Sequence, residues 1–183
     1  MTLLPAMAGL ALVAGLAQLC TRHAGAVLGL SMLQGVAVAL ALAVADWFWA
    51  ASIVLVLSVV SLPFLFAWVP ETHARSMGAA GSAAWPSGWG VAVGAAGAAL
   101  AVQIPVVGLP FAVLLCGLVA VVTRTEPRSR VLGLLGMQHG ITLAACSQGE
   151  SDGLTILAAT LPLVPSVMMA SMAWQRRGGG AAS

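Results

Sequence analysis

The chain has 183 residues, of which 61% are hydrophobic and 7% charged, and its mean hydropathy is +1.05. This composition excludes a water-soluble globular domain and leaves length only for short loops outside a membrane. The formal net charge of +2 gives no indication of a nucleic-acid partner, since loop arginines beside membrane spans account for it.

The hydrophobic runs predict an all-α integral membrane protein, since a membrane span needs about 20 apolar residues. We expect seven spans, at about 3–20, 26–45, 47–69, 89–104, 107–123, 131–147 and 154–174. The first is expected to be retained, because no basic segment precedes it and no clear cleavage site follows it. A polar loop at 71–88 separates three helices within 1–70 from four within 89–174, and a tail follows at 175–183.

The break between the fourth and fifth spans depends on the segment QIPVVGLP. Pro105 and Pro110 are expected to interrupt the helix there, because each removes a backbone donor. A kink in place of a break would move the later arginines to the opposite side of the membrane. The charge pattern therefore favours two separate helices.

The arginines predict the direction of these spans. With seven helices, every basic residue falls on one side, and these residues are Arg22, Arg75, Arg124, Arg128, Arg130, Arg176 and Arg177. Arginine-bearing loops beside spans stay in the cytoplasm, so we expect the N-terminus outside and the C-terminus inside. Asp46, Glu150 and Asp152 fall on the outer side. Abundant Ala, Gly and Arg without Lys, Tyr or Asn are typical of a GC-rich bacterial genome. Together with the seven predicted spans, this residue usage predicts a multi-pass protein of the bacterial inner membrane.

Few polar groups fall inside the predicted bilayer, where an ionisable side chain is costly and marks a candidate functional site. His139, near the middle of span 131–147, is the one titratable nitrogen placed deep in the membrane. A neutral imidazole can pass protons, because one nitrogen donates while the other accepts; the alternative is a hydrogen bond to a neighbouring helix. Gln138 and Gln34 are further proton-path candidates, but interhelical hydrogen bonds are favoured for both because neither can hold a charge.

The remaining polar or unusual positions have structural interpretations. Asp46, at the outer end of the second span, is interpreted as a helix-end charge or cap. Pro162 and Pro165 predict a kink in the last span. Gly136-xxx-Gly140 would allow another helix to approach closely. The three cysteines, Cys20, Cys116 and Cys146, lack metal-ligand spacing, and we expect no metal, no cofactor and no catalytic residue.

The C-terminal half resembles a known family of membrane proteins. RTEPRSRVLGLLGMQHGITLAAC, followed by GLTILAATLPLVPSVMMASMAWQRR, resembles the three-helix subunit K of complex I. It is more similar still to the larger membrane component E of hydrogenase-4 and related formate hydrogenlyases. In the first half, Gln34–Gly35 and Pro63 match the hydrogenase version. The resemblance implies a subunit of a multi-subunit complex, with larger antiporter-like and redox-linked membrane subunits as partners and a hydrated polar axis for protons.

Three positions depart from the family pattern. Gln138 stands where the family has a glutamate, Ser58 corresponds approximately to a lysine, and Pro165 or a neighbour takes the place of a second carboxylate. Gln, Ser and Pro cannot take up or release a proton as carboxylates with tuned pKa values do. The resemblance therefore implies a scaffold with most of the proton relay lost, in which His139 is the one candidate to replace it.

Two other functions stay open. A stand-alone small transporter or channel would use Gln34, Gln138, His139 and the kink in the last span to line a path. Against it, the division into three and four helices lacks the two related halves that such transporters usually show. A subunit that binds quinone or haem would depend on His139, and no second deep histidine is available to pair with it in haem ligation.

Overall fold

The computed structural model describes residues 3–21, 24–63, 92, 94, 96–97, 99–100, 103–124 and 127–148. Within these residues the long elements are helices and no strand occurs, which confirms the all-α class for this part of the chain. The elements are α1 (Leu3–Cys20), α2 (Ala24–Val44), α3 (Phe48–Leu55), the π-helix η1 (Val56–Ser61), α6 (Pro105–Thr123) and α7 (Pro127–Gln148).

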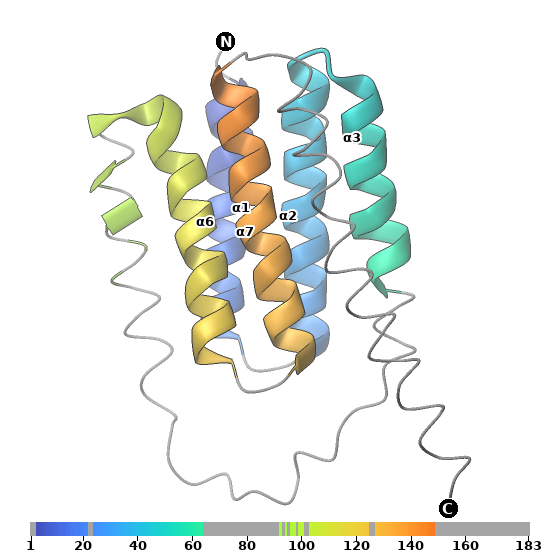
Figure 1. Cartoon of the computed structure of the whole chain (residues 1–183), viewed down its shortest axis with the longest axis vertical. Coiled ribbons are helices and arrows are strands. Elements are labelled where there is room, and N and C mark those ends of the chain that lie inside the picture. Colours follow the sequence, from blue (N-terminus) through green and yellow to red (C-terminus); the bar gives the residue numbers. More distant parts are fainter. Residues whose placement is uncertain are drawn as a thin grey trace, which may run out of the picture.

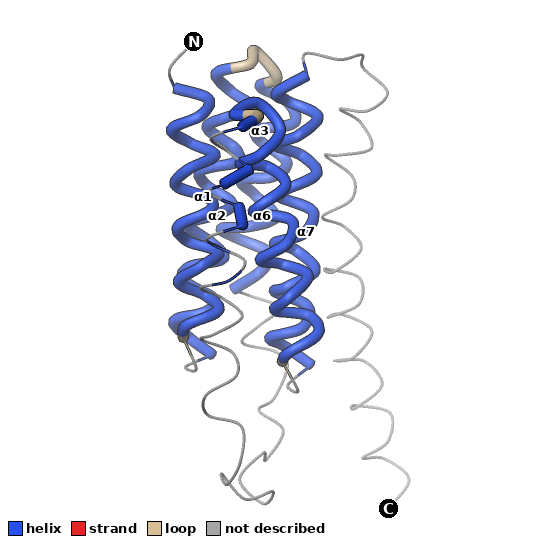
Figure 2. Tube along the Cα trace, turned by 90° about the vertical axis from the view of Figure 1, so that its left-hand side faces the viewer, coloured by secondary structure: helices blue, strands red, loops and turns tan. Residues whose placement is uncertain are grey.

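The helices lie side by side in a bundle, with their axes roughly parallel to its long axis (Figures 1 and 2). α1, α3 and α6 run in one direction, and α2 and α7 run in the other (Figure 1). The α2–α3 loop therefore lies at one end of the bundle and the α6–α7 loop at the other. The main contacts join α6 with α7, α1 with α2 and α6, and α2 with α3 and α7.

Within the described residues, two helices are long and apolar enough to cross a membrane. They are α1 and the segment Gly25–Val44 of α2, while the apolar stretches Phe48–Val60 and Gly108–Thr123 are shorter. The predicted span 154–174 with Pro162 and Pro165, the loop 71–88 and the tail 175–183 lie outside the described residues, as does part of the span 89–104.

Pro105 and Pro110 have different effects on the chain. Ile104 leaves helical geometry, with φ −138° and ψ 78°, and Pro105 opens α6, so the predicted break occurs there. The expectation that Pro110 also interrupts the helix was wrong, because Pro110 lies inside α6. Its missing N–H leaves the carbonyl of Val106 without a helical partner, which a bend near the helix start accommodates. Figure 1 shows this bend in the first turns of α6.

The third predicted helix is not uniform. After Leu55 it widens into the π-helical turns of η1, where the N–H of the following Leu62 bonds to the carbonyl of Leu57, five residues earlier. Pro63 lies two residues beyond η1, and a proline ring crowds the carbonyl four residues before it. A wider turn relieves this crowding. The hydrophobic pattern predicted one regular helix because it does not record this local effect.

The contact between α6 and α7 depends on glycines. A Cβ on Gly140 would lie 2.5 Å from the backbone nitrogen of Leu114, and a Cβ on Gly117 would overlap the backbone nitrogen of Met137. Gly133 also faces the backbone of α6, at Val121. Backbone atoms cannot turn aside as a flexible side chain can, so these positions have no room for a larger residue. The predicted close approach at Gly136-xxx-Gly140 is confirmed, and α6 of the same chain is the helix that approaches.

We predict that Gly140→Ala separates α6 from α7 and lowers the free energy of unfolding by about 1–3 kcal/mol, as overpacking of a tight core does. Gly29→Ala in α2 is the matched control, because a Cβ there would meet nothing within 4 Å. That variant should be neutral or gain up to about 1 kcal/mol from helix propensity. Equilibrium unfolding in mixed detergent micelles measures both. Equal stability of the two variants would contradict the packing described above.

Candidate functional site

The bundle interior contains a group of polar side chains. They come from α1, α2, η1 and α7, each is less than 9% exposed, and they are Gln18, Ser31, Gln34, Ser58, Gln138, His139 and Thr142. His139 is the only His, Asp, Glu, Lys or Arg side chain among the buried residues of the described part. The interior thus holds amides, hydroxyls and one imidazole.

Gln34 links α2 to α1. Nε2 of Gln18 donates to Oε1 of Gln34 at 3.2 Å, so the expected interhelical hydrogen bond is present. Two glycines give the Gln34 amide its space: a Cβ on Gly15 would lie 3.4 Å from its Nε2, and one on Gly136 would lie 3.6 Å from its Oε1. Gln18 was not among the predicted site residues. A second glutamine in the neighbouring apolar span was the signal that could have found it.

His139 and Ser58 meet across Gly35. A Cβ on Gly35 would overlap the Ser58 side chain and would lie 3.6 Å from Cε1 of His139. Gly35 therefore lets the π-helical turns of η1 approach α2 at the level of the imidazole. The predicted proton-path residue His139 and Ser58 come together in this way.

Several buried polar atoms have no hydrogen-bond partner among the described residues. They are both ring nitrogens of His139, Oε1 of Gln138, and the hydroxyl oxygens of Ser31 and Ser58. An unsatisfied buried polar group costs about 1–3 kcal/mol, so such atoms mark a site that needs a further partner. The interhelical hydrogen bonds expected for the His139 ring and for the Gln138 side-chain oxygen are therefore not formed within this part of the chain. The backbone carbonyl of Gln138 does accept a bond from Oγ1 of Thr142, at 2.9 Å.

Arg124 closes the end of the bundle next to this interior. Its Nη2 donates to the carbonyls of Gln18 at 2.6 Å and Thr21 at 2.5 Å, with a longer contact of 3.4 Å to Leu19. These carbonyls belong to the last turn of α1 and the residue after it, where helix geometry leaves carbonyls unpaired and the helix dipole favours a cation. The carbonyl of Arg124 in turn accepts a bond from Nε of Arg130 at 2.6 Å. The charge pattern assigned these arginines only a topological role, so this cap was missed.

Asp46 ends α2 at the opposite end of the bundle. Its φ of 64° is left-handed. Its N–H bonds to the carbonyl of Ala43 at 3.1 Å, and the N–H of Trp47 bonds to that of Leu42 at 2.9 Å. These two bonds form a Schellman motif, which confirms the interpretation of Asp46 as a helix-end residue. Arg124 and Asp46 thus lie in the loops at opposite ends of the bundle (Figure 1).

The arrangement offers no cluster of metal ligands within the described residues. Cys116 and Cys146 are buried and Cys20 is exposed, and all three thiols are free. Pro162 and Pro165, the predicted kink residues, lie outside the described part. Chemically, the site can hold hydrogen-bonding neutral groups and one exchangeable imidazole proton.

A scan against protein-family models finds no matching family, and searches among curated proteins and solved structures find no matching protein.

We predict that Arg124→Gln lowers the free energy of unfolding by about 1.5–3 kcal/mol, the range for hydrogen bonds that involve a charged group. The last turn of α1 should then fray, and its amides should exchange faster with deuterium. Arg130→Gln is the matched control, because this exposed arginine makes one bond to the Arg124 carbonyl and none to the end of α1. Hydrogen exchange monitored by mass spectrometry compares the two; equal effects on α1 would argue against the cap.

Proposed function

We propose that this chain is an integral membrane subunit of a bacterial complex I-like or group 4 hydrogenase-like, antiporter-related complex. Its long apolar helices suit the inner membrane, and the stretch GLLGMQHG within α7 carries the resemblance to component E of hydrogenase-4. In this proposal the chain has seven spans, with the N-terminus outside and the C-terminus in the cytoplasm. The position of Arg124 and Arg130 at the end of the bundle opposite Asp46 supports that orientation.

The observation that carries the proposal is the meeting of Ser58 and His139 at Gly35. Ser58 and Gln138, the neighbour of His139, are the positions that the resemblance aligns with charged members of the family's polar axis. Residues far apart in the sequence come together at the centre of this bundle, and this supports the proposal.

The proposed work of the chain is mainly that of a scaffold between larger antiporter-like and redox-linked subunits. Helices that approach closely through glycine, as α6 and α7 do, favour dense packing over a large ligand cavity. Amides and hydroxyls can donate and accept hydrogen bonds, but they cannot store a charge. Proton conduction is thus attenuated or lost, and what is left depends on His139. Catalysis belongs to other subunits of the complex.

A stand-alone transporter or channel is the second candidate, and the chain of polar groups from Arg124 through Gln18 to Gln34 favours it. A transport path must open to both sides of the membrane. The apolar core between Gln34 and the α2–α3 loop works against this candidate.

We predict that larger antiporter-like and redox-linked subunits co-purify with the chain in fixed ratio when it is purified in mild detergent on a C-terminal tag. Mass spectrometry of the purified material measures this ratio, and an unrelated multi-pass protein with the same tag is the control. A monodisperse chain without partners would contradict the proposed place in a complex. Flux into liposomes that is abolished in His139→Ala and kept in Ser52→Ala would then establish the transporter.

For the residual relay, we predict that His139→Ala in the intact complex lowers proton pumping by more than about twofold while electron transfer continues, because among the buried polar side chains of the described part the imidazole alone can take up and hold a proton. Gln138→Glu should raise proton pumping, since a carboxylate takes up and releases protons. Ser52→Ala is the control, because the Ser52 hydroxyl is exposed and bonds to its own helix at Phe48. If proton pumping is unchanged in both His139→Ala and Gln138→Glu, the proposed proton path is excluded and only the scaffold role is left.

A further inference from the structure

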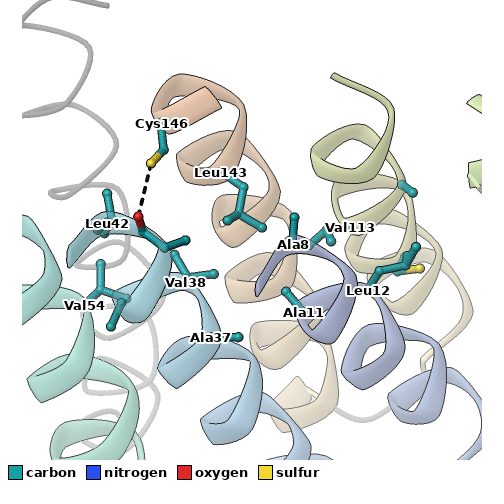
Figure 3. Packing of buried hydrophobic residues seen from close by; sticks show 14 of the residues in the cluster. Ala8, Ala11, Leu12, Ala37, Val38, Leu42, Val54, Val113, Leu143 and Cys146 are labelled. Carbon is teal, nitrogen blue, oxygen red and sulfur yellow. Dashed lines mark hydrogen bonds between the residues drawn. The ribbon is translucent and has the colours of Figure 1, made fainter. Parts of the chain in front are cut away.

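The buried polar side chains are distributed unevenly along the bundle axis. Gln18 lies two residues before the end of α1, at the end of the bundle that holds Arg124. Gln34 and His139 lie near the middles of α2 and α7. Toward the α2–α3 loop the core becomes apolar, as Figure 3 shows for Val38, Leu42, Val54 and Leu143. The Arg124 end also buries an apolar cluster of Val27, Leu62, Val131, Leu132 and Leu135, and Thr142 lies one turn beyond His139 toward the other end. The polar connection at the Arg124 end therefore lies on the α1 side, where Gln18 bonds to both Arg124 and Gln34.

We infer that water enters the bundle from the end that carries Arg124 and reaches Gln34 and His139, while the apolar core seals the other end. This inference concerns the chain itself and holds whether or not the chain works within a larger complex.

The entrance is built from groups that water can solvate. Gln18 takes part twice: its carbonyl accepts from Arg124, and its side-chain amide donates to Gln34. Successive polar groups thus lead from the bundle end to the middle of α2. Water molecules bridge such groups well, because each one donates and accepts.

The interior contains buried polar atoms that water molecules could satisfy. Both nitrogens of His139 and the hydroxyl of Ser58 are buried without a partner among the described residues. A neutral imidazole needs one donor and one acceptor, and a water molecule supplies either. Buried water is typically found where it satisfies two to four such groups.

The seal at the other end consists of tightly packed apolar side chains. Leu42, Val54 and Leu143 are no more than 2% exposed and belong to the same core cluster. At this level Sγ of Cys146 donates to the carbonyl of Ala41 at 3.6 Å (Figure 3). Apolar packing of this kind leaves a water molecule without partners, so it stays dry.

Two native cysteines allow the access of water to the two halves of the bundle to be compared. Cys116 and Cys146 are 2% and 5% exposed, so their burial is similar. Cys116 lies beside Gln34: a Cβ on Gly15 would be 3.8 Å from its Sγ and 3.4 Å from Nε2 of Gln34. Both cysteines belong to the same apolar cluster, but Cys146 lies at the level of Leu42 and Leu143, only two residues before the end of α7 (Figure 3). If depth alone controlled access, Cys146 would meet water first; one-sided entry gives the opposite order.

The experiment follows the S–H stretch of each thiol by infrared spectroscopy after the full chain, in lipid nanodiscs, is transferred to D2O. Cys116→Ala and Cys146→Ala assign the bands, and the exposed Cys20 gives the fast limit. We expect Cys116 to exchange at least about tenfold faster than Cys146, as local solvent access predicts. Equal rates, or faster exchange at Cys146, would overturn the inference.

A variant tests whether the polar groups are the route. Gln34→Leu should slow the exchange of Cys116 to the level of Cys146 and leave Cys146 unchanged, because it replaces the amide beside Cys116 with an apolar side chain. Leu33→Met is the matched control on the exposed face of α2, where no effect is expected. Undiminished exchange of Cys116 in folded Gln34→Leu would also overturn the inference. The comparison in the unaltered chain stands by itself should Gln34→Leu not fold.

Discussion

The backbone contact between α6 and α7 decides where the polar groups of this bundle lie. Gly117, Gly133 and Gly140 let the two helices approach until backbone meets backbone. In a membrane, lipid tails are as apolar as leucine side chains, so helices associate through packing of this kind. With α7 held against α6, Gly136 comes close to Gln34, and His139 comes close to Gly35. The polar interior is therefore a consequence of glycine packing.

Stability and function make opposite demands on the centre of the bundle. Each unsatisfied polar atom around His139 costs about 1–3 kcal/mol, whereas an apolar side chain of similar size would cost nothing of this kind. Close packing between α6 and α7, and the arginine cap on α1, are the contacts that offset this cost. Among the described residues, the His139 ring and the hydroxyls of Ser31 and Ser58 have no hydrogen-bond partner, and packing of these helices alone does not explain why such groups are buried.

The sequence predicted the helices well where a long apolar run ends at a charged or polar residue. Residues 3–20 were expected as a helix and form α1, while α7 begins four residues before the predicted start. Features that depend on tertiary contacts could not be predicted in the same way. The cap at Arg124 is such a feature, because it joins residues more than 100 positions apart. The wide turns of η1 were missed for a different reason, since they follow from a local effect of Pro63 that a hydrophobic pattern does not record.

The site was predictable to a similar degree. A histidine deep in an apolar helix is rare enough to be noticed in one sequence, and His139 is indeed fully buried. Which residues surround it depends on helix pairing, and an apolar pattern does not encode pairing when every face of a helix is hydrophobic. Gly35 shows the difficulty, because it is one of 21 glycines and only its neighbours in space give it a role.

The one-sided polar interior limits what His139 can do. A proton that reaches the imidazole through water from the Arg124 end can return to that end, whereas toward the other end Thr142 lies one turn further along α7 and the core beyond it is apolar. Net transfer across the membrane would need that core to rearrange, or a second path at an interface with another protein of a complex. Under the proposed function, larger neighbours in the complex would complete the path, or the proton would move only locally and the chain would serve as a support.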